Sequence, residues 1–533
     1  MPNLTKISLQ KTTINFFAVA VAALFVFAPP VAGQIASTVT PYPPYPGAAP
    51  SPMYTVTVNG QPVFVHNFLT YNRPSEPPMG YNDYAHFAMT GKVRVRITIA
   101  KGKALSCSVS PRDYGIRPEL EGNTVSFDLD QPRYLLVFIN DPPSFTSNGL
   151  ILFAESPEKN PPKLGDPNVV SILDYGVDRT GKAIATAKIN QAVAEIAARP
   201  GGGVLFFPKD GVYLTGTILM KTNVKLYVEA GALLQGSSKA EDYAQLPIEN
   251  RQVTSLVAFV GVENSGLMGR GTIDGDGYPA LFANRPRGIR GYLVWNSRRI
   301  SFDDLLLRRS CMWTVHVVDS DDFASRNVKI INRKLQYNED VYDFDCSRHM
   351  RVENGFALTM DDFFAIKGTW GTEGAPIEDI VVKGFVGYGF DSGLAIGYEK
   401  RECRFQYVRG VRLEDVHFVS NQVDYAIWIA FTRNPPTGYQ RDEINKPLED
   451  FKFVHCTFEE GGAIYISGGE SPLKDFLFEN CVIYDQIRPS VLNGKFFSPV
   501  FKNLRVRGQL IGSAEEFNKA ATIDIGVPVK FER

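Results

Sequence analysis

The chain has 533 residues, with 56 basic and 57 acidic side chains, a length that allows two domains and a large core. This charge balance does not favour a nucleic-acid partner or an anionic membrane surface. Six cysteines in so long a chain do not make a disulfide framework, and none has the CxxC or Cys/His spacing of a zinc site. The sequence therefore predicts neither a metal nor another cofactor.

The first 33 residues have the pattern of a signal peptide. Lys6 and Lys11 precede an apolar run at residues 16–28, and Val31-Ala32-Gly33 offers a small-residue cleavage site. The run is short for a membrane span, with a retained anchor as the alternative. We expect a secreted protein, extracellular or periplasmic, without membrane contact after cleavage. The Pro-rich residues 34–52 are predicted to be a linker with no fold of their own.

Short segments with alternating apolar residues, separated by turns, follow in residues 53–157. They predict a small antiparallel β-sandwich. A helical pattern at residues 185–198 ends before Pro200 and a Gly run. We expect this helix to cap the first coil of a solenoid and to shield its exposed edge.

Residues 165–533 carry a repeated unit, a turn followed by apolar residues at alternate positions. It recurs at residues 299–302, 327–330, 349–352, 379–382, 410–413, 450–453 and 475–478. The number of residues between successive units varies but never falls below a roughly constant minimum. This indicates a parallel β-helix with insertion loops, and a sandwich of many short strands is the alternative. LEDFKFVHCTFEE aligns with LKDFLFENCVIYD, which places Cys456 above Cys481, as buried thiols or as a bridge. The predicted fold class is all-β, a β-helix preceded by the sandwich.

Three acids stand out in residues 338–368. Asp340 is followed one short repeat unit later by the pair Asp361 and Asp362. Residues one coil apart stack at ~4.8 Å, where two charges repel by about 3.5 kcal/mol at an effective dielectric constant of ~20. Such a cluster retains a proton to unusually high pH. Adjacent residues of a regular strand point to opposite faces, so the pair can act together only at a bend or bulge. Otherwise one of the pair caps a turn.

At these residues the sequence resembles the polygalacturonase family of glycoside hydrolases, from about residue 169 to 501. The resemblance rests on GRGTIDGDG, SCMWTVH, NEDVYDFD and MDDFFAIKG. It implies a right-handed parallel β-helix and hydrolysis with inversion of the anomeric configuration. Carried over, it makes Asp361 the general acid, with Asp340 and Asp362 holding and activating the water. Asp343 and Asp345 lie just beyond Asp340, so one of them could be a supporting acid, and Asp343 is the preferred candidate.

Two departures from that family's pattern concern the substrate. Asp391 and Ser392 stand where a Gly-His-Gly segment is expected, and Trp428 and Ala430 replace the Arg and Lys that bind a uronate carboxylate. The dextranase and isopullulanase family resembles the chain in its layout of sandwich and β-helix. That resemblance implies a neutral, α-linked glycan as substrate. A polygalacturonase-type pectin hydrolase is the alternative, and Arg401, Arg404 and Arg433 are the cations that could restore an anion site.

The predicted partner is a polysaccharide or oligosaccharide, bound by a monomer without nucleic acid. The candidate substrate-binding residues are Asp343, Lys367, Asp391, Tyr398 and Trp428. Trp428 or Tyr398 is the expected stacking surface for a sugar ring, although Trp428 could equally belong to the core. Two other classes remain open, a polysaccharide lyase with Lys367 as its base and a non-catalytic carbohydrate-binding solenoid.

Overall fold

The structure is a computed structural model that describes residues 37–71, 79–143, 147–249, 251–275, 288–310, 312–333, 338–389, 391–397, 403–421, 425–431 and 445–533. The residues from Ser37 to Arg533 form one compact unit. The predicted signal peptide, residues 1–33, lies outside the described residues. Within the described part, no helix has both the length and the apolar character needed to cross a membrane.

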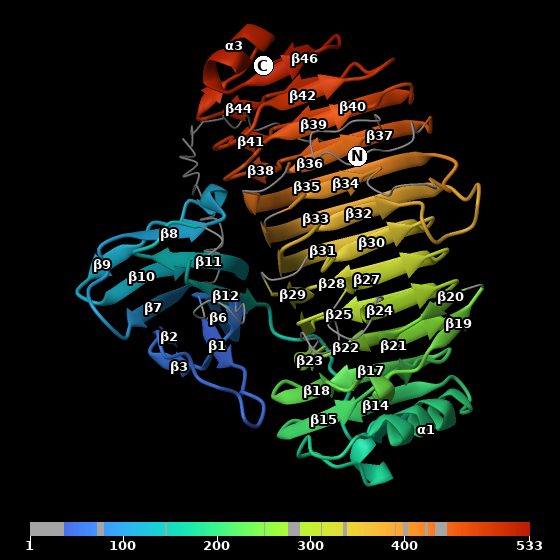
Figure 1. Ribbon diagram of the computed structural model, residues 1–533. Helices are drawn as coiled ribbons and strands as arrows, with labels where there is room; N and C mark the ends of the chain where they lie inside the picture. Colours follow the sequence, from blue (N-terminus) through green and yellow to red (C-terminus); the bar gives the residue numbers. More distant parts are fainter. Residues whose placement is uncertain are drawn as a thin grey trace, which may run out of the picture. The chain divides into compact units, whose positions relative to one another are not determined.

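The N-terminal part is the predicted β-sandwich (blue to teal in Figure 1), and its two sheets enclose a core of their own. One sheet contains β1 (Thr38–Pro41), β4 (Val65–His66), β5 (Leu69–Tyr71), β6 (Met79–Thr90), β8 (Cys107–Ser110), β11 (Arg133–Ile139) and β12 (Gly149–Glu155). The other contains β2 (Tyr54–Val58), β3 (Gln61–Val63), β7 (Val93–Ile99), β9 (Glu119–Glu121) and β10 (Thr124–Leu129). The pairing is antiparallel except between β12 and β6, which run parallel.

The prediction that the Pro-rich residues 34–52 are a linker with no fold of their own is wrong. Its residues Thr38–Pro41 form β1, which pairs antiparallel with β6. Further along, the Tyr45 hydroxyl accepts a hydrogen bond of 2.7 Å from Arg308. The proline-rich composition hid an edge strand, because prolines are tolerated where one side of a strand has no partner.

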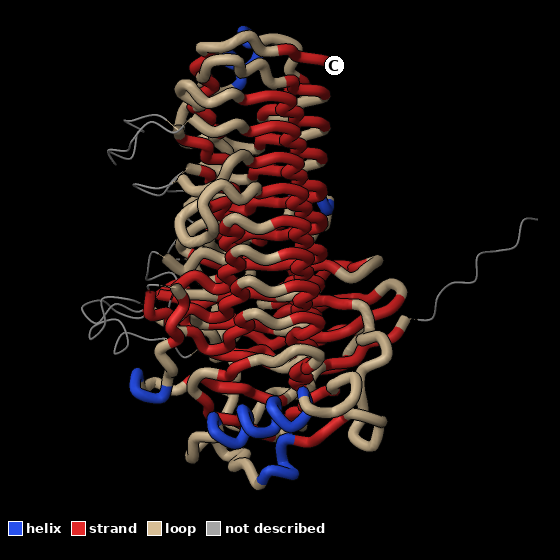
Figure 2. The backbone as a smooth tube through the Cα atoms, turned by 90° about the vertical axis from the view of Figure 1, so that its right-hand side faces the viewer, coloured by secondary structure: helices blue, strands red, loops and turns tan. Residues whose placement is uncertain are grey.

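The rest of the unit is a parallel β-helix built from three rows of stacked strands (Figures 1 and 2). The first row contains β13 (Val169–Ser171), β14 (Gly203–Phe207), β17 (Val224–Val228), β22 (Glu263–Met268), β25 (Arg298–Asp303), β28 (Asp321–Arg326), β31 (Arg348–Thr359), β33 (Ile377–Gly389), β35 (Val408–Asn421), β37 (Leu448–Val454), β40 (Leu473–Glu479), β43 (Val500–Lys502) and β47 (Lys530–Glu532). The long strands β31, β33 and β35 also run through the second row.

The remaining strands complete the coils. The second row contains β15 (Gly211–Thr215), β18 (Ala232–Gly236), β23 (Thr272–Asp274), β26 (Leu306–Arg308), β29 (Lys329–Ile331), β38 (Thr457–Phe458), β41 (Val482–Ile483) and β44 (Arg505–Val506), with β45 (Gln509–Leu510) antiparallel to β44. The third row contains β16 (Ile218–Leu219), β21 (Ser255–Val260), β24 (Arg290–Trp295), β27 (Met312–Val318), β30 (Tyr342–Asp345), β32 (Phe364–Lys367), β34 (Leu394–Ile396), β36 (Ile427–Ala430), β39 (Ile464–Ser467), β42 (Ser490–Asn493) and β46 (Ile523–Ile525). A separate hairpin joins β19 (Leu246–Ile248) to β20 (Arg251–Val253).

Each end of the β-helix carries a short α-helix. The helix α1 (Thr186–Ala197) buries Ile189, Ala192, Val193 and Ile196 against the first coil, which confirms the predicted cap. At the other end, α3 (Ala514–Ala520) begins after Ser513, whose side chain accepts from the Glu516 N–H, and buries Phe517. Short 3-10 turns are η1 (Arg112–Tyr114), η2 (Ile172–Tyr175) and η3 (Ala240–Asp242).

The predicted repeats stack in register, with one exception. Phe451 pairs with Phe476, and their rings stack at 4.5 Å, as the aligned segments predicted. Cys456 and Cys481 are free, buried thiols. The exception is residues 327–330, which enter β29 in the second row, whereas β28 fills the first-row place opposite β25.

The turns between rows explain why Asn and Asp recur at the ends of the repeat units. Asp304, Asn327 and Asn354 all have positive φ, of 70°, 54° and 50°, a conformation that Asn and Asp adopt at least cost after Gly. Their side chains form a ladder across the coils, with the Asn354 amide donating to Asn327 at 2.7 Å and the Asn327 amide donating to Asp304 at 2.8 Å.

The sandwich packs on the β-helix through a shared core. Side chains from β6, β11 and β12 form one buried cluster with side chains from β26, β29, β31, β33 and β35. At its edge the Glu155 carboxylate is buried and accepts from Lys329 at 2.7 Å, from Tyr134 at 2.9 Å and from Arg270. The buried charges of the two parts therefore compensate each other.

Candidate active site

The three predicted acids converge at one end of third-row strands. Asp340 precedes β30, and Asp361 and Asp362 precede β32, whose first residue Phe364 pairs with Tyr342. The Val341 N–H donates to the Asp362 carbonyl at 2.9 Å and fixes this register. Carboxylate oxygens of the three acids all lie within 4.8 Å of one another. The expected clustering is therefore present in the structure.

Asp361 and Asp362 lie in a bend between β31 and β32, so strand alternation does not separate them. The Asp362 N–H donates to Asp361 Oδ1 at 3.0 Å, and the Asn338 N–H donates to Asp361 Oδ2. Asp361 is half-buried, whereas Asp340 and Asp362 are only 3% and 5% exposed. Asp361 is thus the member of the cluster that solvent reaches most easily.

The environment of the acid pair favours protonated carboxyls. Burial, followed by the charge of Asp340, raises the pKa of Asp361 to about 7. Burial, with Asp361, Asp391 and Asp340 as neighbouring charges, raises the pKa of Asp362 well above its ordinary value. The proton retention predicted for the cluster therefore has both of its expected physical causes, desolvation and like charge.

Lys367, at the end of β32, supplies the cluster with a buried cation. Its Nζ lies 2.8 Å from Asp340 Oδ2 and 2.8 Å from Asp343 Oδ1, and 3.9 Å from the centre of the Trp313 ring. Burial and the neighbouring Asp340 raise the pKa of Asp343 well above its ordinary value. Asp343 is fully buried next to Lys367, which also forms an ion pair with Asp340, and its predicted part in substrate binding or as a supporting acid stays a prediction.

A second set of buried groups lies on β24, β27 and β30 of the same row, and the sequence had assigned a possible role only to Asp345, as the alternative supporting acid. Arg290 donates to His316 Nδ1 at 3.0 Å, and its guanidinium lies over the rings of Trp313 and Trp370, 5.0 and 4.4 Å from their centres. Asp345 accepts backbone N–H groups of Thr369, Trp370 and Gly371 at 2.9–3.2 Å. The alternation of Asp343 and Asp345 with apolar residues was the available signal, because it places both on the outer face of β30.

Only some of the other residues predicted to contact the substrate lie in the described part of the structure. Asp391 is half-buried and near enough to Asp362 to raise its pKa, and Ser392 donates to Asp391 at 3.4 Å. Arg404 donates to the Gly371 carbonyl at 3.3 Å. Tyr398, Arg401 and Arg433 lie outside the described residues.

The predicted stacking role of Trp428 needs correction. Its side chain is only 1% exposed and packs with Tyr425, Ala430, Ala463 and Tyr465 in a cluster outside the main core. A ring covered on both sides by protein offers no face to a sugar. The alternative reading of Trp428, as a packing residue, fits the structure.

We therefore expect Trp428→Phe to lower the free energy of unfolding by about 1–3 kcal/mol, because a smaller ring leaves part of a buried site unfilled. KM for the substrate should be unchanged. Denaturant unfolding and steady-state kinetics on the same preparation would check this. A raised KM with unchanged stability would instead restore the stacking role.

The cluster geometry also corrects one expectation about the water. Carboxyl groups of inverting glycosidases typically stand ~6.5–9.5 Å apart, whereas one oxygen of each acid here lies within 4.8 Å of an oxygen of the other two. The three acids are thus packed more closely than the predicted gap for a water between Asp361 and the other two acids suggests. Oxygens at this spacing can still hold one water by hydrogen bonds. The same oxygens are close enough to chelate a cation, although Lys367 already brings a positive charge to Asp340.

Known proteins share both the motifs and the fold. The model of Glycosyl hydrolases family 28 matches residues 205–429. A probable polygalacturonase of Vitis vinifera is 24% identical over 295 residues, which cover 51% of this chain and 58% of that protein. The chain thus spans little more than half the length of this relative.

Two solved structures have a similar fold. Dex49A from Penicillium minioluteum, 14% identical, covers 92% of this chain and 96% of its own length with a TM-score of 0.58. The polygalacturonase from Erwinia carotovora ssp. carotovora, 17% identical, covers 71% and 100% with a TM-score of 0.53. The predicted all-β fold, a right-handed parallel β-helix with an N-terminal sandwich, is confirmed. Residues 205–429 carry the pattern of glycosyl hydrolases family 28, and the resemblance of this chain to the polygalacturonase family is confirmed.

Proposed function

We propose that the protein is a glycoside hydrolase that cleaves α-linked glycosidic bonds of a polysaccharide or oligosaccharide. The observation that carries the proposal is the convergence of Asp340, Asp361 and Asp362 within 4.8 Å, at the place where the family motifs lie. A cluster that retains a proton beside an ion-paired carboxylate contains both an acid and a base. Hydrolysis of a glycosidic bond needs this combination.

Asp361 is the proposed general acid. It is the most accessible of the three, and its pKa of about 7 leaves it protonated in mildly acidic solution and able to protonate the departing sugar oxygen. Asp340, paired with Lys367, is suited to accept a proton from the attacking water, and Asp362 orients that water. Inversion of the anomeric configuration is proposed on the family resemblance, and the close packing of the acids makes a direct test necessary.

We propose a neutral glycan as the substrate. Lys367 is committed to Asp340 and Asp343, and Arg290 is buried beside His316. A uronate carboxylate would need a cation that is still available. The alternative is polygalacturonate, which is favoured by the probable polygalacturonase and by two endo-polygalacturonases of Pectobacterium among the relatives.

The test is an assay of the purified protein on neutral α-glucans and on polygalacturonate. We expect new reducing ends from an α-glucan, no ultraviolet absorbance from a new double bond, and inversion in the first product by NMR. Cleavage of polygalacturonate alone would overturn the neutral substrate. An absorbing product would indicate a lyase, a retained anomer would refute inversion, and no cleavage of any glycan would favour a non-catalytic solenoid.

A further inference from the structure

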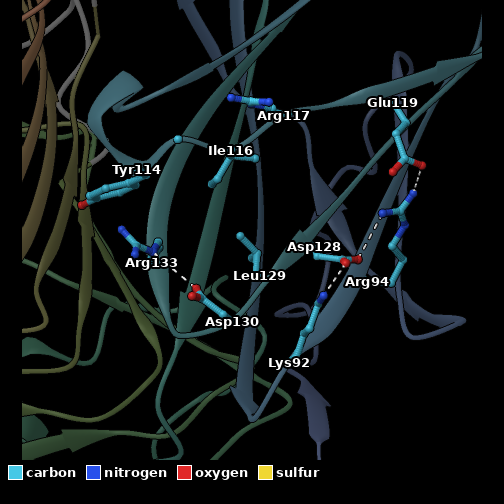
Figure 3. A pocket seen from close by; sticks show the side chains of 11 residues that line it. Lys92, Arg94, Tyr114, Ile116, Arg117, Glu119, Asp128, Leu129, Asp130 and Arg133 are labelled. Atoms are coloured by element: carbon cyan, nitrogen blue, oxygen red, sulfur yellow. Dashed lines mark hydrogen bonds and ion pairs between the residues drawn. The ribbon is translucent and has the colours of Figure 1, made fainter.

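The sandwich contains a cavity of about 340 Å³ (Figure 3). Its walls come from β7, β9 and β10, the start of β11, and the turn that follows η1. The volume lies at the lower end of the range typical of small-ligand sites, about 300–1,000 Å³. The half-buried Ile116 gives the cavity its apolar part, since Leu129 is only 1% exposed, and most of the other lining side chains are polar or charged.

One side of the cavity is neutralised by its own ion pairs. Lys92 lies 2.8 Å from Asp128, and Arg94 lies 3.1 Å from the same carboxylate and also pairs with Glu119. Arg94 and Asp128 are directly opposite each other on the antiparallel strands β7 and β10, which fixes the pair. These cations have their countercharges in place and do not require a ligand.

The cations on the other side of the cavity are less fully paired. Arg133 forms a long ion pair with Asp130, at 4.0 Å, and Arg117 has no ion pair with any described residue. The guanidinium carbon of Arg133 lies over the Tyr114 ring, 4.1 Å from its centre. Figure 3 shows Arg117 and Arg133 on different sides of the turn that carries Tyr114 and Ile116.

We propose that this cavity binds a carboxylated sugar residue of an acidic polysaccharide. A guanidinium binds a carboxylate through two parallel hydrogen bonds, and the apolar part can contact the face of a sugar ring. Asp128, Asp130 and Glu119 lie along the same cavity. Their charges oppose a doubly charged phosphate more strongly than a singly charged uronate.

The site is separate from the acid cluster. The Tyr114 ring meets the edge of His417, 5.0 Å away, on the first- and second-row strand β35. The acid cluster, in contrast, precedes strands of the third row. A polymer held at the sandwich would be tethered to the protein without occupying the acid cluster, so the bound glycan need not be the one that is cleaved. The inference does not depend on the proposed hydrolysis.

The experiment measures binding of a galacturonate trimer by calorimetry to the full chain carrying Asp361→Asn, a change expected to slow any cleavage. Arg117→Ala and Arg133→Gln are each introduced into this background. We expect each to weaken binding about tenfold, and added salt to weaken binding in the parent. The matched control is Arg96→Ala, which removes an exposed cation from the same strand as Arg94 but outside the cavity.

The inference would be overturned by no binding by the parent, by equal loss of affinity in Arg96→Ala, or by unchanged affinity in both cavity variants. A trimer whose carboxylates have been reduced to alcohols should bind at least tenfold more weakly, and equal affinity for it would refute recognition of the carboxylate. Arg117→Ala keeps the test valid if Arg133→Gln disturbs the packing of Tyr114.

Discussion

Replacing Asp361 by Asn is expected to lower kcat by about 10²–10⁴-fold, the usual contribution of a general acid. The amide keeps the shape of the side chain and can still accept from the Asn338 N–H, but it has no proton of suitable acidity to give to the leaving oxygen. KM should change little, since the lost interaction belongs to the transition state. Steady-state kinetics on the substrate identified by the glycan assay would measure both values.

The raised pKa of Asp361 also predicts how the reaction rate and the stability depend on pH. With a pKa of about 7, Asp361 is protonated below that pH and loses its proton as the pH rises through it, so the rate should fall on the alkaline side. In the unfolded chain the same carboxyl has a pKa near 3.8, so the folded state binds the proton more tightly. The free energy of unfolding should therefore fall as the pH rises from about 3.8 to about 7. Asp361→Asn should make the free energy of unfolding less dependent on pH in this range.

A matched control for Asp361→Asn is Asp450→Asn, on an exposed side chain of β37 that pairs with Lys452. It should leave kcat and the pH profile unchanged. Retention of more than a tenth of the activity by Asp361→Asn would assign the proton donor elsewhere, with Asp362 as the next candidate.

Replacing Lys367 by Met is expected to lower the free energy of unfolding by about 3–5 kcal/mol. The Lys367 side chain is 6% exposed and pairs with Asp340 and Asp343, so its removal leaves the buried Asp340 carboxylate without a countercharge. Activity should fall as well, because Asp340, the proposed base, loses its ion-pair partner. Urea unfolding followed by circular dichroism would give the stability.

Two further variants separate charge from packing at Lys367. Lys502→Met removes an exposed cation from its pair with Glu479 and should leave stability unchanged within error. Adding Asp340→Asn to Lys367→Met removes the carboxylate that has lost its countercharge and should recover part of the lost stability. A loss for Lys367→Met as small as that for Lys502→Met would contradict the compensation of Asp340 by Lys367.

The fold was predictable because a β-helix repeats one physical constraint. Each coil must place its apolar residues above those of the last, and the segments containing Phe451 and Phe476 show this directly. The assignment of residues 327–330 to the wrong row shows the limit. Strands of the first and second rows both follow an Asn or Asp turn and both alternate, so Asn327 before β29 resembles a first-row turn.

Within the candidate site, the positions of the acids could be predicted and the environment of the aromatic residues could not. Asp340 and Asp362 are separated by one coil, so stacking alone brings them together. The side chain of Trp428 points away from the main core, as the alternation of residues along its strand indicates. That alternation does not reveal whether neighbouring side chains cover an outward-pointing ring. The role of Lys367 depends on distances to two carboxylates on a neighbouring coil, which only the register supplies.

The shared core between sandwich and β-helix has a consequence for how such proteins can be rearranged. Removing residues 38–157 would expose Phe356, Leu358 and Tyr388 to water and would strand the buried Lys329 without Glu155. The sandwich is therefore not an interchangeable module that recombination could add or remove in one step. The two parts must be inherited together, or a solenoid that loses its sandwich must first acquire polar residues at these positions.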